Sequence, residues 1–148
     1  MTNQTFADAL AQEAGVTHDG ERAVLYQGLR FSFEVSPTSL LLVAYQGSKV
    51  PLLLAPESDY TRQADKLGVS EESKIGTADF DQKYVIRDTT GQAKSFLTES
   101  LQNQVESLAP FVELEFCDDM IRLIKKTDDH SSAIEDLKKL ANLAASLG

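Results

Sequence analysis

Hydrophobic and polar residues alternate strictly over residues 29–35. Side chains of a β-strand point alternately to opposite faces, so this period of two predicts a strand with one packed face and one solvated face. Short apolar runs before and after it favour further strands. The apolar positions of the alternating segment are Leu29, Phe31, Phe33 and Val35, and the neighbouring strands are predicted over residues 23–26, 40–45 and 50–54.

The connection between the last two of these strands contains Gly47 and Ser48, which predict a two-residue hairpin turn. Pro51 has no N–H to donate to a sheet ladder, so the strand over residues 50–54 is predicted to lie at a sheet edge. A short helix is predicted further on, over residues 60–67.

Apolar residues three and four positions apart predict three other helices. The first begins near Thr5, a suitable N-cap, and ends at Gly15, a suitable stop. The second is a continuous helix over residues 92–108, with an apolar stripe that suits packing on a sheet. The third opens with Ser132 and Glu135, which have the spacing of a capping box.

Two aspartates at positions 118 and 119 separate two short apolar segments and predict a hairpin turn between strands over residues 112–117 and 120–124. In that register apolar residues face apolar residues, and a slip of one residue would destroy the match. The predicted pairs are Phe116 with Ile121 and Leu114 with Leu123.

Together these elements predict an α+β fold, with a mainly antiparallel sheet of about six or seven strands and helices packed on one face. The chain has 148 residues, a length that suits one domain and allows a sizeable core. We therefore expect residues 1–148 to form a single globular domain.

Residues 77–88 place two carboxylates on either side of a lone aromatic residue. As a strand, this segment would bury Phe80 with Tyr84 and turn Asp79 and Asp81 to solvent. An Asp-x-Asp pair can bind a divalent cation, so these two acids are the candidate metal ligands; hard cations, however, usually take about six or more oxygen ligands. We therefore favour a structural interpretation, in which Phe80 anchors the segment and both acids are solvated.

Other reactive side chains are few. Cys117 is the only cysteine, which excludes an internal disulfide, and the acids beside it oppose formation of a thiolate. His18 is predicted to lie in a surface loop, and His130 follows two acids that the dipole of the next helix explains. Phosphate-loop, nucleophile-elbow and zinc-helix motifs are missing from the sequence. We therefore predict no catalytic residue and no cofactor.

The chain carries 23 acidic and 14 basic residues, a net charge of -9, and its basic residues do not cluster. A phosphate backbone requires a basic face, so this composition argues against a nucleic-acid partner. The longest apolar run, over residues 40–45, is far shorter than the ~20 residues that span a bilayer, so direct membrane insertion is not expected. The first residues lack the features of a secretion signal, and we predict a cytoplasmic location.

One segment is similar to a known family. Phe80, Tyr84 and Ile86, followed by an Ala-x-x-x-Leu-Thr helix start at residues 93–98, resemble a family of bacterial domains of unknown function over about residues 79–126. The resemblance implies no activity and no catalytic residues. It implies that Phe80, Tyr84 and Leu97 hold a packed module together.

Two hypotheses about function follow. The first is a non-catalytic interaction or self-association domain, with a protein partner or a homo-oligomer, because edge strands and broad apolar helix faces can accept a second chain. The alternative is a small-molecule-binding protein or a hydrolase that uses the carboxylates of Asp79, Asp81 and the acidic turns. The first is favoured because catalysis needs convergent groups and this sequence disperses them.

Overall fold

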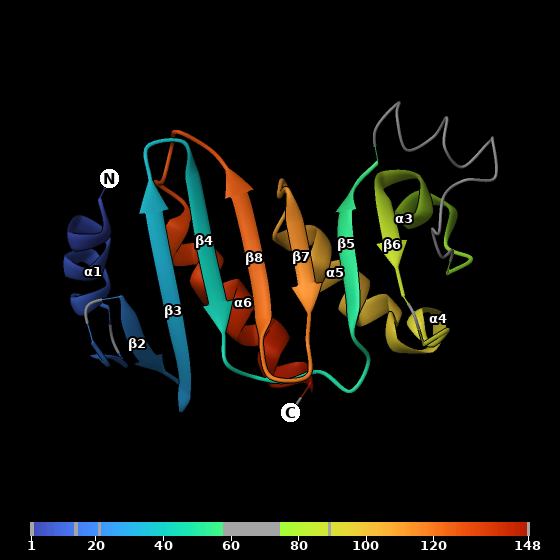
Figure 1. Ribbon diagram of the computed structural model, residues 1–148, viewed down its shortest axis with the longest axis horizontal. Coiled ribbons are helices and arrows are strands. Elements are labelled where there is room, and N and C mark those ends of the chain that lie inside the picture. Colours follow the sequence, from blue (N-terminus) through green and yellow to red (C-terminus); the bar gives the residue numbers. More distant parts are fainter. Residues whose placement is uncertain (1, 14, 21, 58–74, 89, 148) are drawn as a thin grey trace.

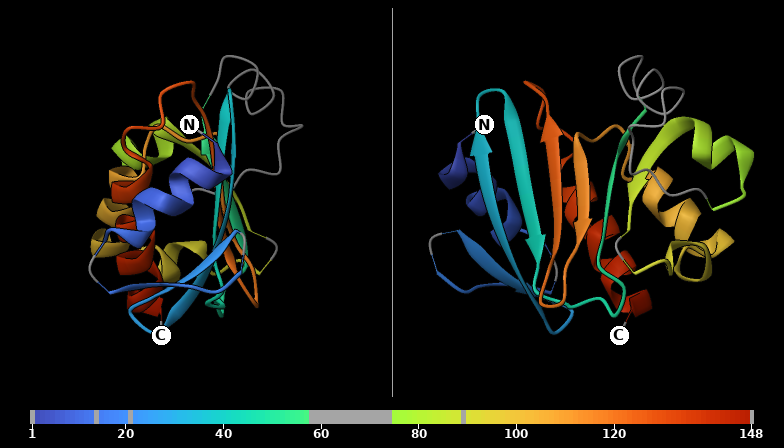
Figure 2. Two further views of the ribbon diagram at one scale, coloured as in Figure 1. Left: turned by 90° about the vertical axis from the view of Figure 1, so that its left-hand side faces the viewer. Right: turned by 45° about the vertical axis from the view of Figure 1, so that its right-hand side comes forward.

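The computed structural model describes residues 2–13, 15–20, 22–57, 75–88 and 90–147 (Figure 1). Within these ranges the chain forms an eight-stranded antiparallel sheet with the strand order β1-β2-β3-β4-β8-β7-β5-β6. Figure 2 shows the helices on one side of this sheet, as predicted for the α+β fold. The strands are β1 Val16–His18, β2 Ala23–Tyr26, β3 Leu29–Ser36, β4 Ser39–Ala44, β5 Leu52–Pro56, β6 Tyr84–Arg87, β7 Glu113–Phe116 and β8 Ile121–Lys126. The helices are α1 Asn3–Ala11, α3 Ala78–Lys83, α4 Ala93–Phe96, α5 Glu99–Ser107 and α6 Ala133–Leu147.

The core lies between the sheet and the helices. Residues directly opposite each other on neighbouring strands point to the same face, so the strand register identifies the core rows. One such row crosses six strands, and every member is buried against the helix layer. This row consists of Phe33, Leu42, Leu123, Leu114, Leu54 and Ile86.

The register of the β7–β8 hairpin is the predicted one: Phe116 pairs with Ile121 and Leu114 with Leu123. The backbone N–H of Cys117 donates to the carbonyl of Met120 across the turn, at 2.8 Å. This prediction succeeded because the strands are neighbours in sequence and only one register joins apolar to apolar.

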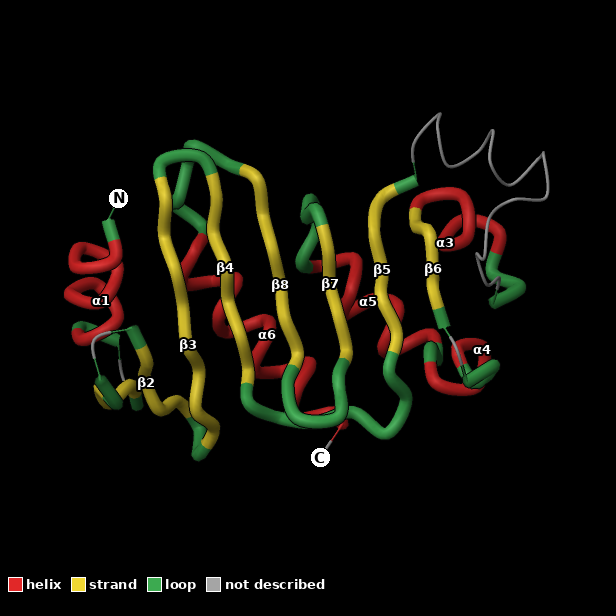
Figure 3. The backbone as a smooth tube through the Cα atoms, viewed as in Figure 1, coloured by secondary structure: helices red, strands yellow, loops and turns green. Residues whose placement is uncertain are grey.

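The predicted hairpin at Gly47 is wrong, because β4 pairs with β3 and β8 whereas β5 pairs with β7 and β6. The connection instead runs past the β7–β8 turn, as the tube in Figure 3 shows. There the N–H of Ser48 donates to the carbonyl of Cys117 at 2.8 Å. A Cβ on Gly47 would lie 2.0 Å from the carbonyl oxygen of Asp118, so the glycine is required by close backbone approach.

The edge position predicted for the strand after Pro51 is also wrong. Pro51 precedes β5 by one residue, so its missing N–H lies outside the ladder, and β5 is paired on both sides. The outermost described strands are β1 and β6. Strand β1 was not predicted: it contains His18, which was expected in a loop, and it pairs with β2.

Residues 77–88 also depart from the predicted single strand, because α3 occupies residues 78–83 and only Tyr84–Arg87 is extended. The carboxylate of Asp81 accepts hydrogen bonds from the backbone N–H groups of Ile75 and Gly76, each at 3.0 Å. These bonds hold the chain in the turn that precedes the helix, and they explain why the alternating pattern does not become a strand.

The predicted continuous helix over residues 92–108 is interrupted, and α4 and α5 are its two parts. Thr98 caps α5, since its hydroxyl accepts from the N–H of Leu101 at 3.3 Å, and Leu97 is buried at the break. Asp88 caps the start of the segment by accepting from the N–H of Ala93 at 2.7 Å. The predicted first helix begins earlier than expected, with Thr2 as its N-cap. The short helix predicted over residues 60–67 lies outside the described residues.

Candidate interaction surface

The face of the sheet opposite the helices carries a second ordered row of side chains, which we call the outer row. In the views of Figure 2 none of the described helices lies over this face. The outer row crosses six strands from β3 to β6 and combines polar, apolar and charged residues. In spatial order it consists of Ser32, Val43, Arg122, Glu115, Leu53 and Arg87.

Two opposite charges occupy the middle of the outer row. Nη1 of Arg122 lies 3.8 Å from Oε1 of Glu115, and their side chains are 35% and 34% exposed. An ion pair this open to water contributes little to stability. The Nε of Arg122 is enclosed and donates to no acceptor. The exposure of this side chain therefore belongs to the outer end of the guanidinium, which also carries N–H donors.

Apolar side chains surround this pair. Val43 and Leu53 flank it within the outer row, and Leu41 lies opposite Ile124 in the adjacent row. Leu41, Leu53 and Ile124 are partly exposed rather than buried. Tyr45 is 41% exposed and extends the surface beyond Val43 along β4. The face therefore presents a charged pair among apolar side chains, and the adjacent row ends in Glu34 beside Leu41 and Glu113 beside Ile124.

The candidate metal ligands do not form a site with other acids. Asp79 is exposed on α3, whereas Asp81 is half-buried and engaged with the backbone of residues 75 and 76. In the described part of the chain, no group of three or more His, Cys, Asp or Glu side chains is placed to hold a metal ion. Both acids were predicted to be solvated. This prediction holds for Asp79. It is wrong for Asp81, whose carboxylate accepts backbone hydrogen bonds in the turn before α3.

Neither histidine is a member of the outer row. His18 is exposed on the edge strand β1. His130 is buried, and its Nε2 donates to the carbonyl of Ser39 at 3.1 Å, which fastens the loop before α6 to the sheet. The acids before α6 were expected to interact with the dipole of that helix. In the structure the carboxylate of Asp129 accepts a hydrogen bond from the N–H of Ser131 at 3.0 Å, just before the helix begins.

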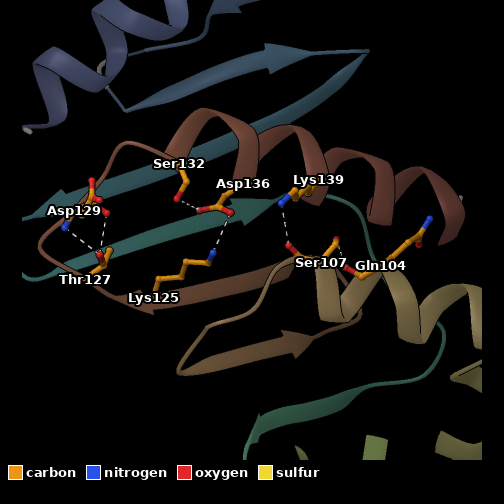
Figure 4. Close-up of polar contacts among 8 residues, drawn as sticks. All are labelled: Gln104, Ser107, Lys125, Thr127, Asp129, Ser132, Asp136 and Lys139. Atoms are coloured by element: carbon orange, nitrogen blue, oxygen red, sulfur yellow. Dashed lines mark hydrogen bonds and ion pairs between the residues drawn. The ribbon is translucent and has the colours of Figure 1, made fainter. Parts of the chain in front are cut away.

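A buried ion pair was not predicted from the sequence (Figure 4). Nζ of Lys125 on β8 lies 2.9 Å from Oδ1 of Asp136 on α6, and the two side chains are 10% and 3% exposed. The hydroxyl of Ser132 donates to the other carboxylate oxygen of Asp136 at 3.4 Å. The alternation of side chains along β8 could have indicated this pair, because Lys125 points to the same face of the strand as the core residues Ile121 and Leu123. The pair joins α6 to the sheet.

Cys117 is expected to react as an ordinary thiol. Burial, and then the neighbouring carboxylates of Glu115 and Asp119, raise the pKa of Cys117 above its usual value. The rate of alkylation by iodoacetamide should therefore be no faster than that of a free model thiol at neutral pH, and it should still be rising with pH there, because the thiolate is the reactive form. Measuring this rate across pH checks the expectation, and a fast plateau near pH 7 would contradict it.

Comparisons with known proteins agree with the fold. No protein-family model matches the chain, and a search of the curated proteins finds no match. The crystal structure of the mycobacterial trehalose monomycolate transport factor A is similar to this chain, with a TM-score of 0.59 and 9% identity, covering 99% of this chain and 94% of that one. At this identity the similarity establishes a shared fold. Among the described helices, none has the length and hydropathy needed to cross a membrane.

Proposed function

We propose that the chain is a non-catalytic self-association domain whose partner is a second copy bound through the sheet face that carries the outer row. The observation that supports this is the order of the row itself. Read from either end, its inner four positions are an apolar residue, a charge, the opposite charge and an apolar residue.

A two-fold axis parallel to the strands, placed between β8 and β7, reverses the order of the outer row. Arg122 of each copy then faces Glu115 of the other, and Val43 faces Leu53. Such an isologous contact closes on itself, as most homodimers do. Two sheets can pack face to face in this way at about 10 Å separation.

The energetics also favour this use of the Arg122–Glu115 pair. In one copy the pair is open to water and worth little, but an interface would exclude water from it and strengthen the attraction across the two-fold axis. Each guanidinium would gain a second carboxylate at its outer, partly exposed nitrogens.

Charge reversal tests the proposal. Arg122→Glu should place four carboxylates at the centre of the dimer and raise its dissociation constant by at least about tenfold, because like charges face each other. Glu115→Arg should have the same effect, and the double reversal should restore association. Sedimentation velocity over a range of concentrations measures each dissociation constant.

The matched control is Lys83→Glu, which reverses one charge of the exposed Lys83–Glu106 pair, 3.6 Å apart and carried by helices α3 and α5 rather than by the sheet face. It should leave association unchanged. Urea denaturation of every variant shows whether the fold survives. A wild-type chain that stays monomeric at all concentrations, or a double reversal that restores nothing, would contradict the proposal.

A further inference from the structure

The outer face of the sheet carries a hollow of about 440 Å³ over β5 and β7, beside the Arg122–Glu115 pair. Leu53 and Glu115 of the outer row contribute to its lining. Pro51 and Cys117 line it as well, and they belong to the next row along the strands. The hollow is therefore mainly apolar on its β5 side, where it can take a side chain of a second protein chain.

Tyr45 is a large exposed side chain on the same face, with 41% of its surface accessible. Its ring is held in place from two sides. Cζ of Arg30 lies 4.8 Å from the ring centroid, and the hydroxyl lies 3.0 Å from Oγ of Ser32. Nε of Arg30 is itself 2.8 Å from Oδ2 of Asp19. An aromatic side chain that is already ordered loses little conformational entropy when a partner buries it.

The proposed two-fold axis brings Tyr45 over the hollow. An axis between β8 and β7 places β4 of one copy against β5 of the other, because the two strands are equally far from it (Figure 1). Along the strands, the ladder places Ala44 level with Leu52. Tyr45 lies one residue beyond Ala44, and Pro51 lies one residue before Leu52, so Tyr45 of one copy faces Pro51 of the other.

We propose that Tyr45 is the anchor of self-association, and that its ring fills the hollow between Pro51 and Leu53 of the second copy. This inference rests on the proposed contact through the outer row. Symmetry makes the anchor contact twice, once on each side of the central Arg122–Glu115 pairs. An aromatic ring buried in a hollow is the usual source of binding energy in an interface, whereas charged pairs mainly fix its register.

Truncation of the ring tests the anchor. Tyr45→Ala should raise the dissociation constant of the dimer by at least about tenfold, because the lost contact occurs twice in each dimer. Tyr45→Phe keeps the ring and should stay within about threefold of the wild type. Sedimentation velocity over a range of concentrations measures both constants, and urea denaturation shows that each variant is folded.

Leu25→Ala is the matched control. Leu25 is also 41% exposed, and it lies opposite Arg30 on the same face of the sheet. It belongs to β2, however, and the two-fold axis places β2 beyond β6, the outermost described strand on that side of the second copy. Its truncation should leave the dissociation constant unchanged. Equal losses for Leu25→Ala and Tyr45→Ala would overturn the anchor, because any exposed apolar side chain would then serve.

A double variant locates the ring in the hollow. Tyr45→Ala and Leu53→Ala remove the two sides of one contact, so together they should weaken association by less than the product of their separate effects. A full product would overturn the assignment of the hollow.

The two proposals fail in different ways. A dimer that responds to Arg122→Glu but not to Tyr45→Ala would refute the anchor and leave the outer-row contact in place. A dimer that is indifferent to Arg122→Glu, or a wild-type chain that stays monomeric, would refute both.

Discussion

Replacing Asp136 by alanine is expected to destabilise the protein by about 3–5 kcal/mol, because the substitution leaves a buried ammonium group without its partner. The side chain of Lys125 is 10% exposed, and Asp136 is the acid that its Nζ contacts, at 2.9 Å. Urea denaturation of the variant and the wild type measures the difference in the free energy of unfolding.

The double variant Lys125→Met/Asp136→Leu tests the effect of removing both charges together. Replacing both charges by apolar groups of similar volume removes the desolvation penalty along with the attraction, so its stability should lie within about 1–2 kcal/mol of the wild type or above it. An Asp136→Ala variant as stable as the wild type would show that the lysine reaches solvent, and would contradict the structural role assigned to the pair.

Replacing Phe80 by alanine is expected to destabilise the protein by about 3–5 kcal/mol, the usual range for truncation of a buried aromatic side chain. Phe80 is 1% exposed, and its ring centroid lies 4.8 Å from that of Tyr84. The Tyr84 ring in turn stacks on Phe111 at 5.5 Å, so the truncation opens a cavity within an aromatic cluster. Urea denaturation again supplies the measurement.

The acids beside Phe80 provide the comparison. Asp79→Asn alters an exposed side chain and should change stability by less than about 0.5 kcal/mol. Asp81→Asn removes the charge from a carboxylate that accepts two backbone hydrogen bonds, and should cost about 1–2 kcal/mol. If Phe80→Ala proves no more damaging than Asp79→Asn, Phe80 does not anchor this segment.

Local patterns predicted the elements more reliably than their arrangement. The α+β class, the burial of Phe80 and the register of the β7–β8 hairpin were all accessible, because each depends on residues near one another in sequence. The strand order was not accessible, because the pairing of β4 with β8 joins segments about eighty residues apart. Gly47 was wrongly assigned to a hairpin turn for the same reason. The group that requires a glycine there is the backbone of Asp118, which is close in space but distant in sequence.

The candidate sites follow the same division. The outer row exists only once six strands are placed side by side, and no linear motif records that Arg122 lies between Val43 and Glu115. The helix break had a local signal, since Thr98 followed by Glu99 is a good N-cap with an acid in the first turn. The apolar stripe through residues 92–108 outweighed that signal, although the stripe survives the interruption because both helices pack on the same core.

One distance tests self-association through the outer row most directly. In a Cys117→Ser background, a nitroxide label on Arg87→Cys gives two labels per dimer, and pulsed electron paramagnetic resonance measures their separation. The proposed two-fold axis puts these positions five strand spacings apart on sheets that face each other, so the expected separation is roughly 25–35 Å. A pairing of β6 edges would instead bring the labels within about 15 Å. That short distance, or the absence of any dipolar signal, would contradict the proposed dimer.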